Sequence, residues 1–423
     1  MRKGLILATA VGFLANIQVK AQITTDELAG QEINTITTAV PFLLISPDSR
    51  SGAMGDVGVA LSPDANSIHW NPSKLAFIEE KNDLGFSLSY SPWLRELVND
   101  INLAYLSGYK KLDRNSAVGM SLRYFSLGNI TFTNIYGEKT SDFKPNEFAI
   151  DGVYSRKLSE KFSAGIAARY IYSNLTGGIS TSGGDTKPGQ SVAVDLSAYY
   201  QTDKFDLSGK DVYVAAGMNI SNIGAKMSYT DLANRDFIPT NLRLGTSLNA
   251  ELDEFNKITL AFDANKLLVP TQPEYKLVGG QYVYDANNNP VIQSGRDPNV
   301  GVASAIFGSF SDAPGEVPQI NGDTQDPVKG TRFREEMREI NFSVGTEYLY
   351  NNLLAVRAGY FHEHWSKGNR RFIAMGAGIR YSALELDLSY LVALTQRSPL
   401  ANTLRFTIRF NFGDVKAEEA SDS

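Results

Sequence analysis

The last part of the chain alternates apolar and polar residues in five successive runs across residues 340–412. In the final run, for example, Leu404, Phe406 and Ile408 alternate with polar residues such as Arg405. Because successive side chains of a pleated strand point to opposite faces, this period of two indicates β-strands. Each run is about nine to eleven residues long, the length that a tilted strand needs to cross a bilayer.

The two faces of these runs differ in a way that favours a membrane barrel. The polar face carries Arg, Glu, Asp and many glycines. The apolar face is aliphatic in its middle and has Tyr or Phe at the strand ends, which is typical of the aromatic girdles of outer-membrane barrels. A large soluble antiparallel sheet is the alternative interpretation, but such a sheet usually points its apolar face inward.

The same alternation continues upstream and predicts an all-β fold, a barrel of about 14 antiparallel strands over residues 81–412. On the strand Ile101–Tyr109 we expect Leu103, Tyr105 and Tyr109 to face lipid. The connections between strands alternate between short and long, which a soluble sandwich has no reason to do. Because outer-membrane barrels have short periplasmic turns and long outer loops, we expect both termini in the periplasm.

The N-terminus predicts export. A basic start at Arg2 and Lys3, an apolar core and a small-residue cleavage pattern at Val19–Ala21 are typical of a secretory signal peptide, here residues 1–21. The chain contains no cysteine, so neither a lipoprotein anchor nor a disulfide framework is available. The sequence also has no later run of 18 consecutive apolar residues, which excludes helical membrane spans.

Residues 22–80 lack the alternation and contain many small and turn-forming residues. We expect short helices over Asp48–Met54 and Pro72–Phe77, the second with Asn71 as its N-cap and Pro72 in its first turn. A polar segment of this length before a barrel fits inside the lumen. We therefore predict an N-terminal lumen plug.

Two further segments stand apart from the strands. The connection over residues 265–339 is far longer than ordinary connections, and such loops are usually functional or disordered. A mobile loop with a small hairpin is one interpretation, but the apolar stretch Val300–Phe310 favours docking against a partner. The tail, residues 413–423, is acidic and polar, and we expect it to be disordered in the periplasm.

No catalytic constellation emerges, so the chain is predicted not to be an enzyme. The sequence has three histidines: His69 beside Trp70, and the pair His362 and His364 without an obvious third ligand, so we predict no metal and no cofactor. No Gly-x-Ser-x-Gly motif is present. The net charge of −6 and the absence of a basic run argue against nucleic acid as a partner.

Charged residues recur on the polar face of the strands. We interpret them as the lining of a polar lumen in which charges pair with one another and with the plug, rather than as a selectivity filter. The basic members are Arg123, Arg169, Arg243, Arg357, Arg380, Arg405 and Arg409, and the acidic ones are Glu147, Asp151, Asp195, Asp263, Glu347, Glu385 and Asp387.

The plug carries a specific resemblance. The stretch Asp48–Ala60, followed by Ile68–Ala76 with Trp70, Asn71 and Pro72, resembles the N-terminal signature of the PorV family, an outer-membrane component of the Bacteroidetes type IX secretion system. The signal peptide, length and strand pattern fit this family along essentially the whole chain. The Asn-Pro element and the 14-stranded pattern are also similar to the FadL-type transporters of hydrophobic compounds, a broader match.

The resemblance implies a non-enzymatic role in the outer membrane. Proteins of this family associate with the large translocon barrel, accept cargo bearing a C-terminal secretion domain, and carry it to an attachment complex with a PorU-like sortase. Membrane lipid is the remaining partner that we expect. From loop length and exposed apolar character alone, the candidate contacts on the outer loops are Trp93, Leu94, Val302, Ile306, Phe307 and Phe310.

Two other functions stay open at this stage. A FadL-like channel would pass hydrophobic small molecules through a kink or gap in the wall, and it predicts a continuous apolar pocket reaching the plug. An enzyme acting on lipid A is a third possibility, for which no catalytic residues present themselves.

Overall fold

The computed structural model describes residues 33–79, 82–94, 98, 100–133, 136–177, 180–181, 184–230, 235–395, 398 and 400–413. The predicted signal peptide, residues 22–32 and residue 80 of the predicted plug, and all of the predicted tail except Gly413 lie outside these residues. Among the described residues, no helix combines the length and the apolarity needed to cross a bilayer.

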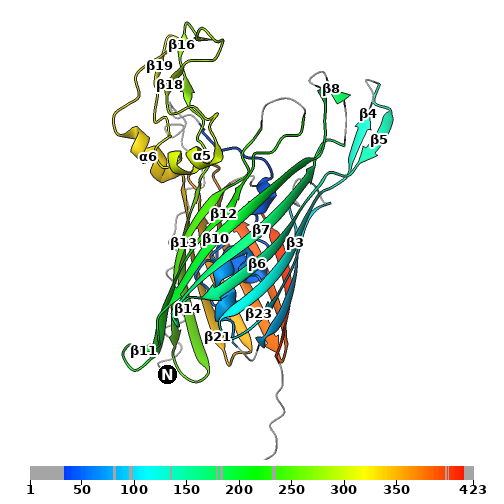
Figure 1. Cartoon of the computed structure of the whole chain (residues 1–423), viewed down its shortest axis with the longest axis vertical. Coiled ribbons are helices and arrows are strands. Elements are labelled where there is room, and N and C mark those ends of the chain that lie inside the picture. The colour runs from blue at the N-terminus through cyan, green and yellow to red at the C-terminus, as the bar shows by residue number, and fades with distance from the viewer. Residues whose placement is uncertain are drawn as a thin grey trace, which may run out of the picture.

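Fourteen antiparallel strands form a closed barrel, which confirms the predicted fold class (Figure 1). In chain order they are β1 (Leu84–Pro92), β2 (Ile101–Lys111), β3 (Ser116–Leu127), β6 (Asn146–Lys157), β7 (Phe162–Asn174), β10 (Gly189–Gln201), β12 (Asp211–Gly224), β13 (Asn241–Glu251), β14 (Asn256–Leu267), β21 (Ile340–Tyr350), β22 (Leu354–His362), β23 (Arg371–Tyr381), β24 (Leu384–Ala393) and β25 (Thr403–Phe412). The ring closes where β1 pairs with β25.

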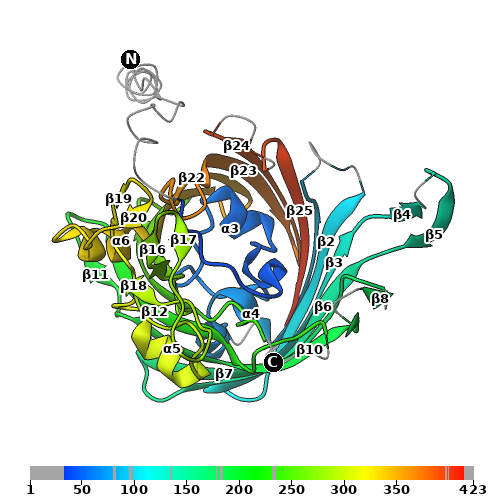
Figure 2. The same cartoon turned by 90° about the horizontal axis from the view of Figure 1, so that it is seen from above.

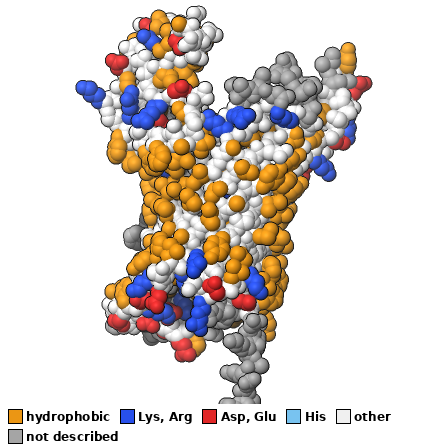
Figure 3. Space-filling model, in the orientation of Figure 1, with side chains coloured by type: hydrophobic (Ala, Val, Ile, Leu, Met, Phe, Trp, Pro, Cys, Tyr) orange, Lys and Arg blue, Asp and Glu red, His pale blue; other side chains and the backbone are white. Residues whose placement is uncertain are grey.

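Burial alternates along the barrel strands as the period of two requires. On β1, Phe86, Leu88 and Tyr90 are exposed on the outside, and the residues between them are buried. On the side of the barrel that Figure 3 shows, a belt of hydrophobic side chains crosses the wall at mid-height. Since charged groups are confined to the inner face and the rims, this belt has the character of a lipid-facing surface.

The prediction of which face of β2 points toward lipid was wrong. Leu103, Tyr105 and Tyr109 are buried inside the barrel, as are Ser107 and Lys111, and the outward side chains on this strand are those of the alternate residues, including Leu106. Leu103 packs in the same cluster as Phe42, which belongs to the segment inside the lumen. An apolar patch on that segment therefore determines which face of β2 turns inward.

The two ends of the barrel carry different connections. Short turns such as 112–115, 158–161 and 351–353 lie at one end, whereas long loops such as 128–145 and 268–339 lie at the other. Long loops point away from the cell in outer-membrane barrels, so we call this end the outer end.

Residues 33–79, the lumen segment, lie within the ring of strands (Figure 2). They contain η1 (Pro41–Leu44), α3 (Ser49–Ala53), α4 (Ser67–Trp70) and η2 (Pro72–Phe77), where η denotes a 3-10 helix. Helix α3 contacts β22 to β25, and η2 contacts β3, β6, β7 and β10, so the segment touches both sides of the wall. Asn34 donates its backbone N–H to the carbonyl of Ser366 in the β22–β23 loop (3.0 Å), so the segment begins at the outer end.

The outer loop, residues 268–339, folds into a small body above the barrel that has two helices and three short strand pairs rather than a single hairpin. It contains β15 (Glu274–Tyr275), β16 (Leu277–Val278), β17 (Gln281–Tyr282), β18 (Ile292–Ser294), α5 (Val302–Gly308), β19 (Gln319–Ile320), β20 (Asp323–Thr324) and α6 (Thr331–Arg338). The remaining short strands are β4 (Ile130–Thr133), β5 (Lys139–Phe143), β8 (Ser180–Thr181), β9 (Gly184–Asp185) and β11 (Phe205–Asp206).

Candidate functional site at the outer end

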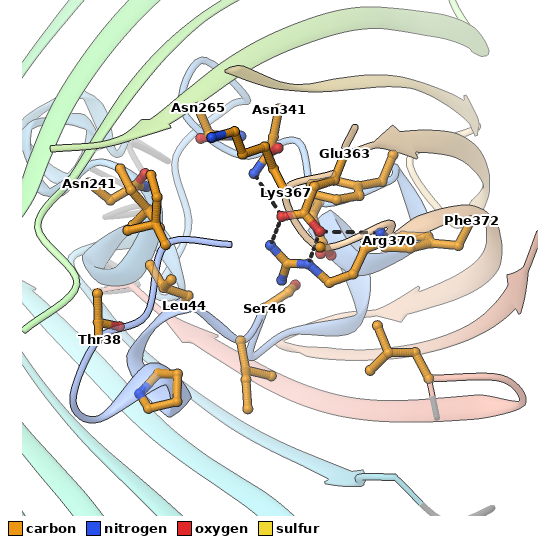
Figure 4. Close-up of a pocket in the computed structure, with 18 of the residues that line it drawn as sticks. Thr38, Leu44, Ser46, Asn241, Asn265, Asn341, Glu363, Lys367, Arg370 and Phe372 are labelled. Carbon is orange, nitrogen blue, oxygen red and sulfur yellow. Dashed lines mark hydrogen bonds and ion pairs between the residues drawn. The ribbon is translucent and has the colours of Figure 1, made fainter. Parts of the chain in front are cut away.

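A cavity of about 450 Å³ lies at the outer end of the barrel, between the lumen segment and the wall (Figure 4). Thr38, Leu44 and Ser46 of the lumen segment line one side, and wall residues such as Asn341 and Phe372 line the other. Small-molecule pockets commonly span roughly 300–1,000 Å³, so the cavity is large enough for a small ligand.

The predicted plug motif forms the turn between α4 and η2, and Trp70 contributes to the cavity lining. Asn71 has extended backbone angles (φ −164°, ψ 95°), and its side chain accepts a hydrogen bond from the N–H of Ser73 (3.2 Å). Pro72 occupies the first turn, where its missing N–H needs no partner. The Asn71 amide also donates to the carbonyl of Ala198 on β10 (3.0 Å), so the motif fastens the lumen segment to the wall.

The indole of Trp70 is fixed from three sides. Its Nε1–H donates to Asp48 Oδ1 (2.7 Å), while Asp48 Oδ2 accepts from the N–H of Ser51 as the N-cap of α3 (2.9 Å). A Cβ added at Gly58 would lie 2.1 Å from the indole, so only glycine fits there. On the wall side, the guanidinium of Arg243 lies 4.7 Å from the ring centroid.

Two arginines of the cavity lining lack a close carboxylate partner. Among the described residues, Arg243 has no carboxylate oxygen within 4.0 Å. The nearest carboxylate oxygen to the Arg405 guanidinium belongs to Asp56, 3.7 Å away, and Arg405 also lies 5.8 Å from the ring centroid of Trp93. The other cations of the lining are paired: Arg370 makes two hydrogen bonds to Glu363 (Figure 4), and Lys367 binds Glu339 in the outer loop.

Other charged side chains of the lumen form the pairs expected for a polar interior. Arg357 binds Glu347 and Asp387 (2.6 Å each), and Arg169 lies 2.5 Å from Asp151. Arg123 instead donates to backbone carbonyls of the lumen segment and lies 2.7 Å from His69 Nδ1. His69 is therefore a buried hydrogen-bonding residue.

The six candidate contact residues do not form one surface. Trp93 lines the cavity and is half-buried against the apolar cluster of the lumen segment, and Leu94 is half-buried beside it. On α5, Val302 and Ile306 are half-buried. Their neighbours Phe307 (79% exposed) and Phe310 (52% exposed) point into solvent. Only these two present a large apolar surface to a partner outside the barrel.

Helix α6 anchors the outer loop through its acidic residues. Glu335, Glu336 and Glu339 are buried, and their carboxylates bind Lys367 and Lys266 of the barrel end at 2.5–3.2 Å. No local pattern in the sequence indicates this network, because each lysine lies tens of residues from the acids that it binds.

Asp312, Glu336 and Glu339 have carboxylate oxygens within 4.8 Å of one another. Their charge is met by the two lysines, and Asp312 accepts a hydrogen bond from the N–H of Thr271 (3.1 Å). Burial raises the pKa of Asp312 to about 6. The cluster thus acts as an ion-pair network that holds the loop.

The histidines at the rim have separate partners. His362 Nδ1 lies 3.0 Å from the Tyr360 hydroxyl, and His364 Nδ1 lies 2.9 Å from the Ser366 hydroxyl. Burial lowers the pKa of His364 to about 4, so its imidazole is neutral at physiological pH.

Comparisons with known proteins give one family. The sequence model described as "Type IX secretion system protein PorV" matches residues 28–274. No curated protein sequence matches the chain. Among solved structures, the Pseudomonas putida toluene transporter TodX is 14% identical with a TM-score of 0.45, covering 90% of this chain and 98% of that one. The Ralstonia pickettii toluene transporter TbuX is 11% identical with a TM-score of 0.45, covering 86% and 98%. A Pseudomonas aeruginosa FadL homologue is 11% identical with a TM-score of 0.39, covering 87% and 99%.

Proposed function

The chain belongs to the PorV family of type IX secretion proteins, and on that premise we propose that it is a non-enzymatic cargo carrier of the outer membrane. In this role it binds the C-terminal secretion domain of cargo at the large translocon barrel and shuttles it to an attachment complex with a PorU-like sortase. Both the barrel fold and the family support an outer-membrane location.

The observation that carries this proposal is the exposed aromatic pair of Phe307 on α5 and Phe310 just after it, above an occupied lumen. Residues 33–79 contact both sides of the wall, so a folded cargo has no room inside the barrel. Contacts with large partners then have to be made from outside. Phe307 and Phe310 are held there by an ordered loop, and exposed aromatic side chains are favoured at the centres of protein interfaces.

A double substitution tests this assignment. We expect Phe307→Ser with Phe310→Ser to lower the yield of cargo and translocon co-purified with the chain by about tenfold or more, since each buried aromatic contact contributes on the order of 1–2 kcal/mol. The measurement is quantitative mass spectrometry of proteins captured from native membranes.

The matched control is Val278→Ser, an exposed apolar residue (54%) in the same outer loop. It should leave capture unchanged. If the α5 double variant assembles normally and secretes and captures cargo like the wild type, α5 is not the contact surface. If deletion of residues 268–339 also leaves secretion intact, the whole loop is excluded.

The cavity supports a second candidate function, a channel for hydrophobic small molecules. Its lining includes Leu44, Phe361, Phe372 and Leu391, and it reaches Trp70 at the lumen segment. A β-bulge in the wall, where the register of β10 against β12 shifts near Asp195, adds an irregularity of the kind that a lateral exit would need.

Filling the cavity separates the two functions. Leu391→Trp should reduce binding of a fluorescent fatty acid or aromatic to the purified protein, while leaving cargo secretion unchanged. A wild-type protein that binds neither class of probe would remove the channel from consideration. If Leu391→Trp abolishes cargo secretion although the wild-type protein binds no such probe, the cavity serves cargo transport instead.

A further inference from the structure

Helix α6 has its polarity reversed relative to an ordinary surface helix. The acidic residues Glu335 and Glu336 are buried against lysines of the barrel end, whereas Phe333 (72% exposed) and Met337 (45% exposed) point outward. A surface helix normally buries its apolar stripe and exposes its charges. The exposed apolar side of α6 therefore needs a partner that the described chain does not supply.

The charges beside this apolar side are basic. Lys329, Arg332 and Arg334 are exposed, and the two acids within the helix are turned inward and neutralised. Arg334 makes a long, exposed ion pair with Glu316 (3.8 Å), and Arg332 donates one hydrogen bond to the Ser294 hydroxyl (3.0 Å). We call the set Val328, Lys329, Arg332, Phe333, Arg334 and Met337 the α6 face.

The short connection between α6 and β21 keeps the α6 face close to the outer edge of the hydrophobic belt. Helix α6 ends at Arg338, and the barrel strand β21 begins at Ile340. Phe342, on the outward side of β21, is exposed like the rest of the hydrophobic belt. Three residues span at most about 11 Å, so Met337 lies within that distance of the outer edge of the belt at Ile340.

The surface view agrees with this placement. Hydrophobic side chains continue from the belt to the base of the outer loop, and Lys and Arg side chains gather above them (Figure 3). An interfacial amphipathic helix places its apolar residues at the level of the acyl chains and its basic residues at the level of the lipid headgroups.

We propose that the α6 face binds the outer surface of the bilayer, with Phe333 and Met337 inserted among the upper acyl chains and Arg332 and Arg334 bound to phosphate groups of anionic lipids. Continuity with the lipid-facing belt and the excess of positive charge select a phosphate-bearing lipid over other occupants. The contact holds the outer loop at one height above the membrane.

The absence of cysteine allows a direct test, because one introduced thiol is labelled uniquely. Met337→Cys, carrying an environment-sensitive fluorophore, is placed in nanodiscs of phosphatidylcholine mixed with lipid A. We expect blue-shifted emission and strong quenching by nitroxide-bearing lipids. The control Ile320→Cys, exposed on the β19–β20 hairpin, should show neither. If the fluorophore at position 337 is as exposed to water as the fluorophore at position 320, the proposal is overturned.

The charges are tested separately. Titration of lipid A into labelled protein in neutral detergent should give a dissociation constant that rises about fivefold for Arg332→Gln and for Arg334→Gln, as expected for losing one cation near an anionic surface. Arg334→Lys should keep the wild-type value. Equal affinities for all variants would contradict the proposal. Shielding of the label in native membranes, but not in lipid A nanodiscs, would show that a protein covers this face.

Discussion

Gly359 on β22 shows how closely the lumen segment approaches the wall. A Cβ built at this position would lie 1.9 Å from the backbone carbon of Met54, and one at Gly345 would lie 2.5 Å from the Met54 carbonyl oxygen. Both glycines are therefore required by backbone-to-backbone contact rather than by a turn. The sequence shows them only as inward-facing strand positions, so their role was not predictable before Met54 was placed.

We predict that Gly359→Ala loosens the seating of α3, because backbone atoms have to move by more than an ångström. Overpacking of this kind costs about 1–3 kcal/mol. The matched control is Gly152→Ala, whose added Cβ meets nothing within 4 Å. The measurement is the temperature at which the folded band is lost in a heat-modifiability gel. Equal midpoints for the two variants would show that the lumen segment is not seated against Gly359.

The docking of the outer loop should depend on pH through Asp312. Burial raises the pKa of this carboxyl from 3.8 to about 6, so the docked loop favours the protonated form. The contribution of Asp312 itself to docking, apart from the ion pairs of α6, is then largest below pH 4, declines as the pH rises to about 6, and is lost above that. We expect hydrogen exchange in α6, corrected for its intrinsic pH dependence, to accelerate by about tenfold or more over this range. Asp312→Asn should abolish that dependence, and an unchanged profile would exclude Asp312 as its origin.

At the scale of elements, strand positions were predictable and one strand face was not. A period of two identifies a strand, but it selects the lipid-facing side only when the other side is polar. On β2 the inward side carries Leu103 and Tyr109, which pack on the lumen segment, and the buried Tyr105, so both faces are largely apolar. Contact with Phe42, some 60 residues upstream along the chain, decides which face of β2 turns inward.

The outer loop was recognised by its length, and the apolar stretch within it coincides with α5. The ion pairs that attach the outer loop to the barrel end were not predicted. The acids of α6 look like solvent-exposed helix residues in the sequence, and their lysine partners stand in unrelated positions, Lys266 at the end of β14 and Lys367 in the loop after β22. Long-range ion pairs leave no periodic signal, so only the folded arrangement identifies them.

We predict that Lys367→Met releases the C-terminal part of the outer loop. The lysine Nζ lies 2.6 Å from Glu335 and 3.0 Å from Glu339, and both carboxylates are buried. Removing one partner of a buried ion pair costs about 3 kcal/mol or more. The control is Lys204→Met, which breaks an exposed pair with Glu251 and should cost less than about 1 kcal/mol. Hydrogen exchange in α6 reports the difference, and equal protection in both variants would contradict it.

At the scale of the whole molecule, ion pairs join the lumen segment to the wall. Arg50 makes two hydrogen bonds to Glu347 on β21 (3.1 and 2.8 Å) and lies 3.1 Å from Asp64. Asp64 in turn pairs with Arg409 on β25 (3.1 Å). The general expectation that inward charges pair was confirmed for these groups, whereas the specific partners required the three-dimensional arrangement.

The lumen segment has a consequence for how the chain is built. It begins at the outer end and leads into β1 at the opposite end, so it traverses the ring lengthwise before any wall strand is made. The ring is sealed only when β25, the final strand, pairs with β1. Pairing of β1 with β25 therefore encloses the segment, which favours an assembly in which the sheet closes around it.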